Sequence, residues 1–555
     1  MIFIIICLAG HVASQKVFDH AYNGYMKYGY PSDELEPLSC TPKDPKLGQD
    51  VMGNFTLSLI DSLTTTLTMR KPKKFIYAMQ MLKLENFNIN STISIFEVTI
   101  RVLGALTSTA LLLEDNQFMN WLTNDTAIYS KAVQFKPLLI RLSIDLGNRL
   151  LLAFNTSTGI PPSKTNLMYG LPVFNLTGSI KSTNLPSSHR TTNPAAAGTL
   201  LLEFGMLSIL SNNKTYYNYA KRALLASFHT HTKLGLFGNE INIDGHLINH
   251  YHSIGGGIDS LYEYLLKGYL VFHDDTLLDL FLISYQQLNT YNAYKSQKKY
   301  YYNFNKQCYQ VRMPSTFHLS THALNGRLLM GRISGLAAFF PGMQILFGDT
   351  SMAFLHLLIY IRLLEVYPFV PEAYSISSQN VEFNMYLLRP EVYESMVFVA
   401  NAFIESRPIF HSIMEESIDR LNYYCKTKCG YASLKNLLMG IKDPRMESYF
   451  LSETTKYMYL MFHQNHYFLK EKYTFTTEGH PIKITNWASS KSMYPLYHLR
   501  HDNVIFAKKY LQCPIVQNPY VSLMNKTYNA FEAFLIEKKI RKLVRKSYKR
   551  ILFDS

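Results

Sequence analysis

Charged residues are sparse in this chain of 555 residues: they make up 17% of the sequence, whereas apolar residues make up 47%. This balance excludes an intrinsically disordered or collagen-like chain. The length allows one large domain or several ordinary ones, with a sizeable core. Acidic residues are outnumbered, which gives a formal net charge of +15 and first suggests nucleic acid or an acidic membrane as partner. However, eight of the cations lie together in residues 538–550.

A long hydrophobic run is missing from the N-terminus. Residues 2–9 (IFIIICLA) are apolar, but a membrane span takes about 20 residues. A short run followed by small residues predicts a secretory signal peptide, residues 1–14, with cleavage after Ser14; a buried first strand is the alternative. The best later candidate for a membrane span, residues 352–370, carries charged side chains that would be costly in lipid. We therefore expect no transmembrane segment after the signal.

Seven Asn-X-Ser/Thr sequons follow the predicted signal, and together they favour a glycosylated protein of the secretory pathway. Nucleic acid is then excluded as a partner. The predicted glycosylation sites are Asn54, Asn90, Asn124, Asn155, Asn175, Asn213 and Asn525.

Cysteine is scarce as well. Five cysteines remain after cleavage, and an odd number in an oxidising compartment leaves at least one thiol free or bound to another protein. Cys425 and Cys429 have no second cluster to complete a zinc site, which argues against a cysteine-bound metal.

Alternating patterns typical of strands are few, and apolar residues instead recur at three- and four-residue steps. This periodicity predicts an all-α protein with many antiparallel helices and long functional loops. The clearest helical segments are residues 94–113, 197–210, 260–272, 390–403 and 447–462.

Composition stays uniform from about residue 22 to residue 486, which predicts one large domain over residues 15–490. A C-terminal extension, residues 491–555, follows it. The extension contains a basic helix-like segment, residues 537–550, which is either a solvated terminal helix or a membrane or partner site.

Several carboxylates lie inside the predicted apolar helices, where an unpaired charge is costly to bury. Glu97 lies within the nearly all-apolar residues 93–103, and Arg101 follows one helical turn later. A structural Glu97–Arg101 ion pair and a functional Glu97 both explain this placement.

Two further acids lie at predicted helix starts. Asp259 follows the glycines of residues 255–257; such a turn lets backbone approach a ligand, although aspartate is also an ordinary helix cap. Pro390 begins another helix, with Glu391 and Glu394 on one face. Paired carboxylates without a Cys–His nucleophile pattern are typical of glycoside hydrolysis. These residues therefore predict a carbohydrate-acting enzyme.

Ten segments in order, covering roughly residues 20–485, resemble glycoside hydrolase family 47, the class I α-1,2-mannosidases. Within that family the chain is most similar to the ER degradation-enhancing α-mannosidase-like group. The segments are HAYNGYMKYGYPSDELEPLSC from His20, NSTISIFEVTIRVLG from Asn90, LLLAFNTSTGIP from Leu150, AAGTLLLEFGMLS from Ala196, GGGIDSLYEYLLKG from Gly255, GLAAFFPGMQ from Gly335, YLLRPEVYES from Tyr386, KCGYASLKN from Lys428, RMESYFLSETTKYMYLMF from Arg445 and FTTEGHPI from Phe475.

The resemblance implies an (α/α)7 barrel that removes α-1,2-linked mannose from N-glycans with inversion at the anomeric carbon. By motif position, Glu97 would be the general acid, acting through a water molecule. Glu391 would be the general base, and Asp259 the third essential acid, with an acid/base or water-positioning role.

The resemblance also implies a calcium ion at the base of the barrel, with Thr477 as its protein ligand through the hydroxyl and the backbone carbonyl. Oxygen-only ligation suits calcium. Tyr449 matches an aromatic platform beneath the sugar. The positions that match those lining the bound mannose and the calcium waters are Glu203, Arg389, Glu394, Glu453 and Glu478.

Cys40 and Cys429 both fall within resemblance motifs, so we expect a disulfide between them. An ER oxidoreductase is a candidate partner through a remaining cysteine, Cys308, Cys425 or Cys513. The expected substrates are high-mannose N-glycans on misfolded glycoproteins in the ER lumen, trimmed for ER-associated degradation. The alternative is a catalytically weak barrel that binds glycans or misfolded glycoproteins in the same process.

Overall fold

The computed structural model of the chain describes residues 2–43, 52–82, 84–171, 185, 190–295, 300–304, 307–311, 316–376 and 378–484. The predicted extension, residues 491–555, lies outside this part of the chain, and so do Asn175, Cys513 and Asn525.

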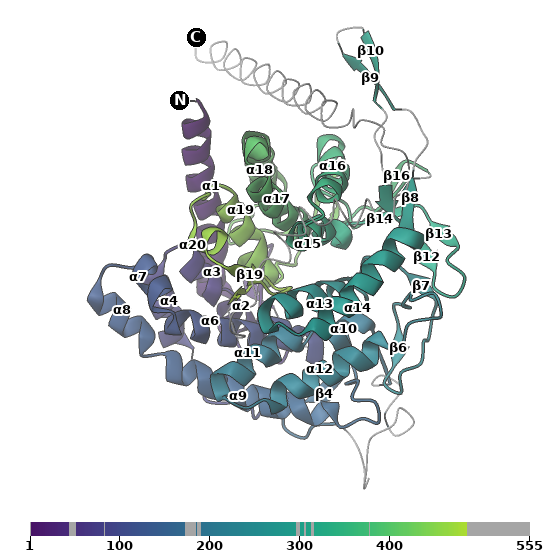
Figure 1. Cartoon of the computed structure of the whole chain (residues 1–555). Helices are drawn as coiled ribbons and strands as arrows, with labels where there is room; N and C mark the ends of the chain where they lie inside the picture. The colour runs from purple at the N-terminus through teal and green to yellow at the C-terminus, as the bar shows by residue number, and fades with distance from the viewer. Residues whose placement is uncertain are drawn as a thin grey trace, which may run out of the picture.

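Helices dominate the structure and surround its centre, which confirms the all-α prediction (Figure 1). All five segments predicted as helical consist mainly of helix, although a turn at residues 199–200 interrupts the second of them. In chain order the helical elements are α1 (Ile2–Gly24), η1 (Tyr25–Gly29), α2 (Leu57–Asp61), α3 (Leu63–Thr68), α4 (Pro72–Met81), α5 (Ile95–Val98), η2 (Thr99–Leu103), α6 (Gly104–Glu114), α7 (Asn116–Leu122), α8 (Thr126–Val133), α9 (Lys136–Leu151), η3 (Leu152–Phe154), α10 (Pro194–Gly198), α11 (Leu201–Ser211), α12 (Thr215–Phe228), α13 (Asp259–Phe272), α14 (Asp275–Gln287), η6 (Leu288–Asn292), η7 (Leu336–Phe339), α15 (Phe340–Phe347), α16 (Thr350–Val366), α17 (Glu391–Ala402), η8 (Ile404–Ser406), α18 (Arg407–Tyr424), η9 (Phe450–Thr454), α19 (Thr455–Met461) and α20 (Tyr467–Lys470).

The strands are short and form small antiparallel sheets of two or three strands. They are β1 (Leu35–Glu36), β2 (Thr41–Pro42), β3 (Thr92–Ser94), β4 (Lys164–Asn166), β5 (Thr191–Thr192), β6 (Ile241–Asn242), β7 (Tyr251–His252), β8 (Ala293–Lys295), β9 (Tyr300–Phe304), β10 (Gln307–Val311), β11 (Thr316–His318), β12 (Ser320–His322), β13 (Leu328–Met330), β14 (Arg332–Ser334), β15 (Ala373–Ser375), β16 (Asn380–Phe383), β17 (Ser433–Asn436), β18 (Ile441–Asp443), β19 (Tyr473–Phe475) and β20 (Pro481–Lys483).

The β19–β20 hairpin lies among the helices near the centre of the molecule (Figure 1). Its turn, residues 476–480, contains Thr477 and Glu478. Because helices from both halves of the chain surround the hairpin, this turn is brought to residues that are distant in sequence.

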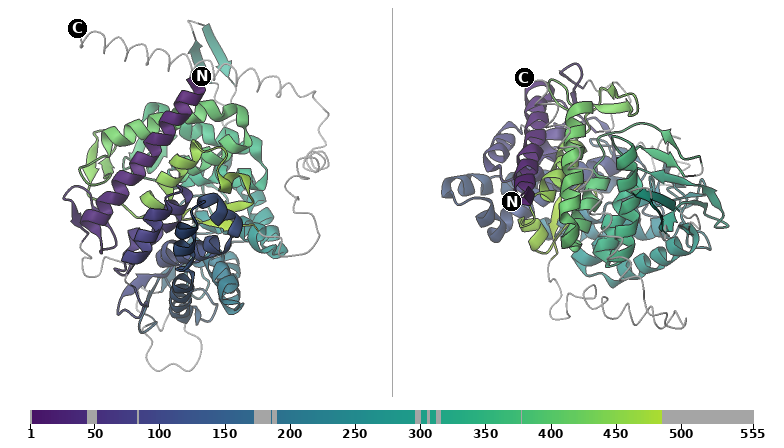
Figure 2. Two further views of the ribbon diagram at one scale, coloured as in Figure 1. Left: turned by 90° about the vertical axis from the view of Figure 1, so that its left-hand side faces the viewer. Right: turned by 90° about the horizontal axis from the view of Figure 1, so that it is seen from above.

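Helix α1 continues without a break through Ser14, the residue after which we predict cleavage. Ser14 is fully buried, and α1 packs against α18 and α19 near the other end of the described chain (Figure 2). The alternative prediction of a buried first strand is therefore wrong, because these residues are helical. Nothing in the fold tests removal of residues 1–14, and the signal peptide stays a prediction.

Two helical segments of the described chain, Ile95–Glu114 and Pro194–Ser211, are long and apolar enough to cross a membrane by length and composition alone. In the fold 83% and 72% of their most apolar stretches are buried inside the protein. Both segments carry candidate site residues, Glu97 and Glu203. Their apolar character therefore matches that of helices in a protein core.

A disulfide joins Cys40 to Cys429, with their Cα atoms 5.8 Å apart, as expected from the resemblance. It links the segment after α1 to the turn after α18. Cys425 is a free and fully buried thiol, and burial raises its pKa. A buried, protonated thiol is a poor nucleophile, so this residue does not suit a mixed disulfide with an oxidoreductase.

The five described sequon asparagines are exposed to solvent, although glycosylation itself stays a prediction. They are Asn54, Asn90, Asn124, Asn155 and Asn213.

Candidate active site

Glu97 and Arg101 form the first part of the site. The Ser94 hydroxyl caps the short helix α5 by accepting a hydrogen bond from the Glu97 N–H at 3.3 Å. The Glu97 carboxylate accepts from Arg101 Nε at 2.9 Å and lies 2.8 Å from Nη2. Its side chain is 28% exposed, whereas that of Arg101 is 8% exposed. The ion pair weighed from the sequence therefore exists, and the carboxylate still reaches open space.

Arg389 and Glu391 lie at the start of α17. Glu372 accepts two parallel hydrogen bonds from Arg389, at 2.9 and 3.0 Å, and this fixes the guanidinium. Glu391 is the first residue of the helix and is half-buried. Burial raises the pKa of Glu391 to about 8, and the positive charge of Arg389 opposes that shift.

Asp259 is the first residue of α13 and follows Gly257, whose φ of +88° lies in the left-handed region. The side chain is half-buried. Burial raises the pKa of Asp259 to about 7, against the hydrogen bond from the Ser260 N–H at 2.9 Å. Arg389 is near enough to lower the same pKa. Asp259 and Glu391 therefore share one arginine.

Tyr449 lies between the two arginines. The guanidinium carbon of Arg101 is 5.3 Å from the centre of its ring, and that of Arg389 is 5.8 Å away. Both distances suit cation–π contact. Through this ring the Glu97 side of the site is connected to the Glu391 side.

Glu203 and Thr477 meet at Tyr264. The Tyr264 hydroxyl donates to Glu203 Oε1 at 2.5 Å and accepts from the Thr477 N–H at 3.3 Å. Glu203 is fully buried, and burial raises its pKa to about 8. A Cβ atom added at Gly104 would lie 3.3 Å from Glu203 Cγ and 2.9 Å from His480 Cδ2, so a side chain there would crowd both residues.

Glu394 shares a buried lysine with Glu263. Lys267 Nζ forms an ion pair with Glu263 and lies 3.8 Å from a carboxylate oxygen of Glu394. Burial raises the pKa of Glu394, and Lys267 opposes that shift. The three charges are enclosed together beneath the start of α17.

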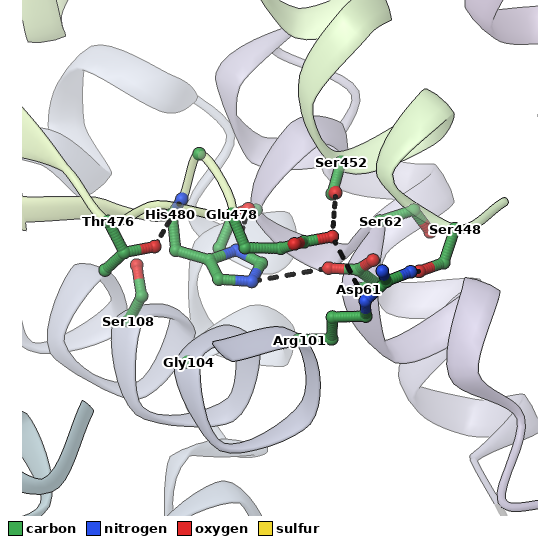
Figure 3. Close-up of polar contacts among 12 residues, drawn as sticks. Asp61, Ser62, Arg101, Gly104, Ser108, Ser448, Ser452, Thr476, Glu478 and His480 are labelled. Atoms are coloured by element: carbon green, nitrogen blue, oxygen red, sulfur yellow. Dashed lines mark hydrogen bonds and ion pairs between the residues drawn. The ribbon is translucent and has the colours of Figure 1, made fainter. Parts of the chain in front are cut away.

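Glu453 and Glu478 lie close to each other beside the β19–β20 turn. Burial, and then the charge of the other carboxylate, raises the pKa of Glu453. Burial also raises the pKa of Glu478, while Arg101, 3.8 Å away, lowers it. The Ser452 hydroxyl donates to Glu478 at 3.4 Å (Figure 3).

Three charged or titratable residues of this region were not singled out from the sequence. Asp61 lies 3.3 Å from His480 Nε2, and both side chains are fully buried (Figure 3). Lys456 donates to Thr64 Oγ1 at 3.0 Å and to the Gly479 carbonyl, and burial lowers its pKa to about 7.

The sequence signals only one of these three residues. Asp61 ends the largely apolar LSLID, the kind of placement that singled out Glu97, whereas Lys456 and His480 lie among polar residues in ETTKY and TEGHP. Lys267, four residues after Glu263, repeats the spacing of Glu97 and Arg101.

The residues present fit a hydrated calcium ion. No three His, Cys, Asp or Glu side chains converge to hold a metal directly in the described residues. The Tyr264 hydroxyl links Glu203 to Thr477, and Glu203 Oε2 is buried without a hydrogen-bond partner among the described residues. An ion held by Thr477, with waters oriented by such carboxylates, would use the lone pairs of these oxygens.

The structure thus brings all the predicted catalytic and sugar-site residues into one connected group. Glu97, Asp259, Glu391, Arg389 and Thr477 are half-buried, so a ligand can reach them. Four acids lie deeper and are buried: Glu203, Glu394, Glu453 and Glu478. Carboxylates that face open space from different helices, without a nucleophilic Cys or Ser among them, can protonate a leaving oxygen and activate water.

Known proteins share this sequence and fold. The chain is 34% identical over 491 residues to ER degradation-enhancing alpha-mannosidase-like protein 3 of Homo sapiens, covering 86% of this chain and 48% of that protein. It is 32% identical over 482 residues to Alpha-mannosidase I MNS4 of Arabidopsis thaliana, covering 84% of this chain and 69% of that protein. The chain spans about half the length of several curated relatives that it matches.

Among solved structures, the alpha-1,2-mannosidase from Trichoderma reesei is similar, with a TM-score of 0.68 and 22% sequence identity. The likeness covers 86% of this chain and 99% of that one. That protein is an (α/α)7 barrel, so the predicted fold is confirmed.

The model of glycosyl hydrolase family 47 matches residues 17–484, which include every candidate residue of the site. The chain therefore belongs to glycosyl hydrolase family 47.

Proposed function

We propose that this chain is a calcium-dependent, inverting α-1,2-mannosidase that trims high-mannose N-glycans on misfolded glycoproteins in the ER lumen and so marks them for degradation. Family membership and the mannosidase names of its relatives support a mannosidase or a degradation role. The single observation that carries the proposal is the placement of three acids, Glu97, Asp259 and Glu391, half-buried around one Arg–Tyr–Arg group.

In the proposed reaction, a water molecule attacks the anomeric carbon as the glycosidic C–O bond breaks. Glu391 takes a proton from that water, and the leaving oxygen receives a proton from the acid side of the site. Inverting enzymes hold the two carboxyl groups about 6.5–9.5 Å apart so that the water fits between base and sugar. Arg389 binds between Glu372 and the base and keeps Glu391 oriented.

The acid side of the site is divided between two residues. The ion pair with Arg101 fixes the position of the Glu97 carboxylate, which suits a group that orients a proton-carrying water. Burial raises the pKa of Asp259 to about 7 and that of Glu391 to about 8, so these values do not separate the acid from the base. We therefore keep the assignment that motif position implies: Glu97 is the general acid, acting through this water, and Asp259 has an acid/base or water-positioning role.

Thr477 is the proposed calcium ligand. When bound, the ion supplies positive charge that favours the ionised forms of nearby carboxylates and binds sugar hydroxyls. Tyr264 holds the Thr477 backbone from one side. On the other side, Lys456 binds the Gly479 carbonyl and holds the turn in place.

The secretory route remains part of the proposal. A signal peptide over residues 1–14, glycosylation of exposed sequons and residence in the ER lumen fit the names of the relatives. An ER oxidoreductase stays a candidate partner, through Cys308 or Cys513 rather than the buried Cys425.

The test is incubation of the purified full chain with a nine-mannose N-glycan, with calcium or with a chelator, and with and without an ER oxidoreductase. We expect mannose release that the chelator abolishes. Release in no condition, together with retained binding of misfolded glycoproteins, would refute the enzyme and support the alternative of a glycan-binding factor.

A further inference from the structure

The residue before Arg389 has an unusual backbone. Leu388 has a φ of +62° and is fully buried. In this left-handed region the Cβ atom of an L residue approaches the following carbonyl oxygen, so bulky residues rarely adopt it. Such a conformation persists only where the surroundings hold it in place, and it is frequent at functional sites.

Two hydroxyl groups hold this segment. The Thr454 side chain donates to the Leu388 carbonyl at 2.7 Å, and the Tyr449 hydroxyl donates to the Leu387 carbonyl at 2.6 Å. Thr454 is fully buried at the end of the π-helical element η9, which Tyr449 immediately precedes. Two adjacent carbonyls are thus bound by one element.

The segment is also fixed on both sides. Before it, Tyr386 exchanges two backbone hydrogen bonds with Leu434, at 2.9 and 2.8 Å. After it, Glu372 binds the Arg389 guanidinium. The left-handed residue therefore turns the chain sharply between a fixed strand-like pair and the first turn of α17. This turn sets the direction in which Arg389 and Glu391 leave the backbone.

We propose that Thr454 and Tyr449 are positioning residues that hold Leu388 in the left-handed conformation and thereby aim Arg389 and Glu391 at the sugar. We call the Thr454 and Tyr449 hydroxyls the clamp. Its effect on the base Glu391 rests on the proposed function, whereas its effect on the Leu388 backbone conformation does not depend on any activity. Neither Thr454 nor Leu388 touches the reacting atoms in this scheme, and Tyr449 acts through its hydroxyl as well as its ring.

The first arm of the test removes the clamp. Thr454→Val is nearly isosteric but has no donor, and Thr454→Ser keeps the hydroxyl as a control. With α-1,2-linked mannobiose as substrate, we expect Thr454→Val to lower kcat per folded molecule about tenfold while KM changes by less than about twofold. Thr454→Ser should stay within about twofold of the unaltered chain in both constants. If Thr454 only stabilised the fold, Thr454→Val would lower the melting temperature but leave kcat per folded molecule unchanged.

The second arm tests the backbone conformation. Leu388→Gly and Leu388→Ala both remove the packed side chain, but only glycine adopts positive φ without crowding. We expect Leu388→Gly to unfold at a higher temperature than Leu388→Ala, the reverse of the usual order. In the Thr454→Val background, Leu388→Gly should also have a higher kcat than Leu388→Ala.

The two arms separate the clamp from the proposed function. If the unaltered chain releases no mannose, the enzyme proposal fails, and the order of the two melting temperatures still decides whether the turn is clamped. An unchanged kcat in Thr454→Val would overturn the clamp. A higher melting temperature for Leu388→Ala than for Leu388→Gly would also overturn it.

Discussion

Two sets of acids in this barrel differ in how far solvent reaches them. The open acids, Glu97, Asp259 and Glu391, are half-buried and come from the first turns of three helices. The enclosed acids are at most 9% exposed: Glu203, Glu394, Glu453 and Glu478. Burial raises the pKa of members of both sets, as in Glu391 and Glu203, so pKa alone does not distinguish them.

Their partners differ only in part. The open acids have arginines beside them, Arg101 and Arg389, and still face space that a ligand can enter. The enclosed acids Glu203 and Glu394 lie against Tyr264 and Lys267, whereas Glu478 lies 3.8 Å from Arg101, the partner of Glu97. We propose that the open acids perform the reaction, and that the enclosed acids line the sugar site and orient the waters of a bound cation.

The largest expected effect is the loss of the base. Glu391→Gln keeps the size of the side chain but cannot take a proton, and general-base catalysis contributes about 10²–10⁴-fold. We expect mannose release from mannobiose to fall about 1,000-fold with an unchanged melting temperature. Glu405→Gln, at an exposed acid outside the site, is the matched control. A Glu391→Gln variant as active as this control would place the base elsewhere.

Breaking an enclosed charge group should instead affect stability. Lys267→Met leaves Glu263 and Glu394 buried without their cation, and removing one partner of a buried pair costs about 3–5 kcal/mol. The free energy of unfolding in urea measures this loss. Lys136→Met breaks the exposed pair with Glu114 and should cost less than about 1 kcal/mol. Equal losses in the two variants would contradict the enclosure of the charge group around Lys267.

Calcium removal should come next in size. An ion present at 100 times its dissociation constant stabilises the folded state by about 2.7 kcal/mol. We expect a chelator to lower the melting temperature of the unaltered chain, and calcium but not magnesium to restore it. Thr477→Ala should reduce the calcium-dependent shift. Identical calcium titrations of the two proteins would remove Thr477 from the ligand set.

The smallest effect, taken per pH unit, concerns the pH dependence of stability. Glu203 has a pKa of about 8 in the folded state, above its ordinary value of 4.5. Between these values the folded state holds a proton that the unfolded state has released, so this residue makes stability fall as pH rises, by at most about 1.4 kcal/mol per pH unit. In the presence of a chelator, Glu203→Gln should therefore show a shallower fall in unfolding free energy from pH 5 to pH 8. Parallel curves for the variant and the unaltered chain would show that the pKa of Glu203 is not raised in the folded state.

The sequence predicted the helical fold because apolar periodicity over segments such as residues 94–113 and 260–272 is a strong local signal. Glu97 was noticed because an unpaired carboxylate is costly to bury in an apolar run. The catalytic roles of Glu97, Asp259 and Glu391 came from their positions in the family motifs. The disulfide between Cys40 and Cys429 also followed from the motifs and is confirmed.

Other features depend on contacts between distant segments and left no local pattern. The pairing of Asp61 with His480 joins residues more than 400 positions apart. The left-handed turn at Leu388 has no glycine to indicate it, because hydroxyl groups of Tyr449 and Thr454 impose it from another helix. Nor does the sequence show that α1 continues past Ser14, since an apolar run followed by small residues fits both a signal peptide and a packed helix.

The most direct test of the central claim is the configuration of the mannose first released from α-1,2-linked mannobiose, followed by proton NMR in the presence of calcium. The account predicts that β-mannose appears first and that Glu391→Gln abolishes its appearance. Release of α-mannose first, or β-mannose release that is unaffected by Glu391→Gln, would contradict it.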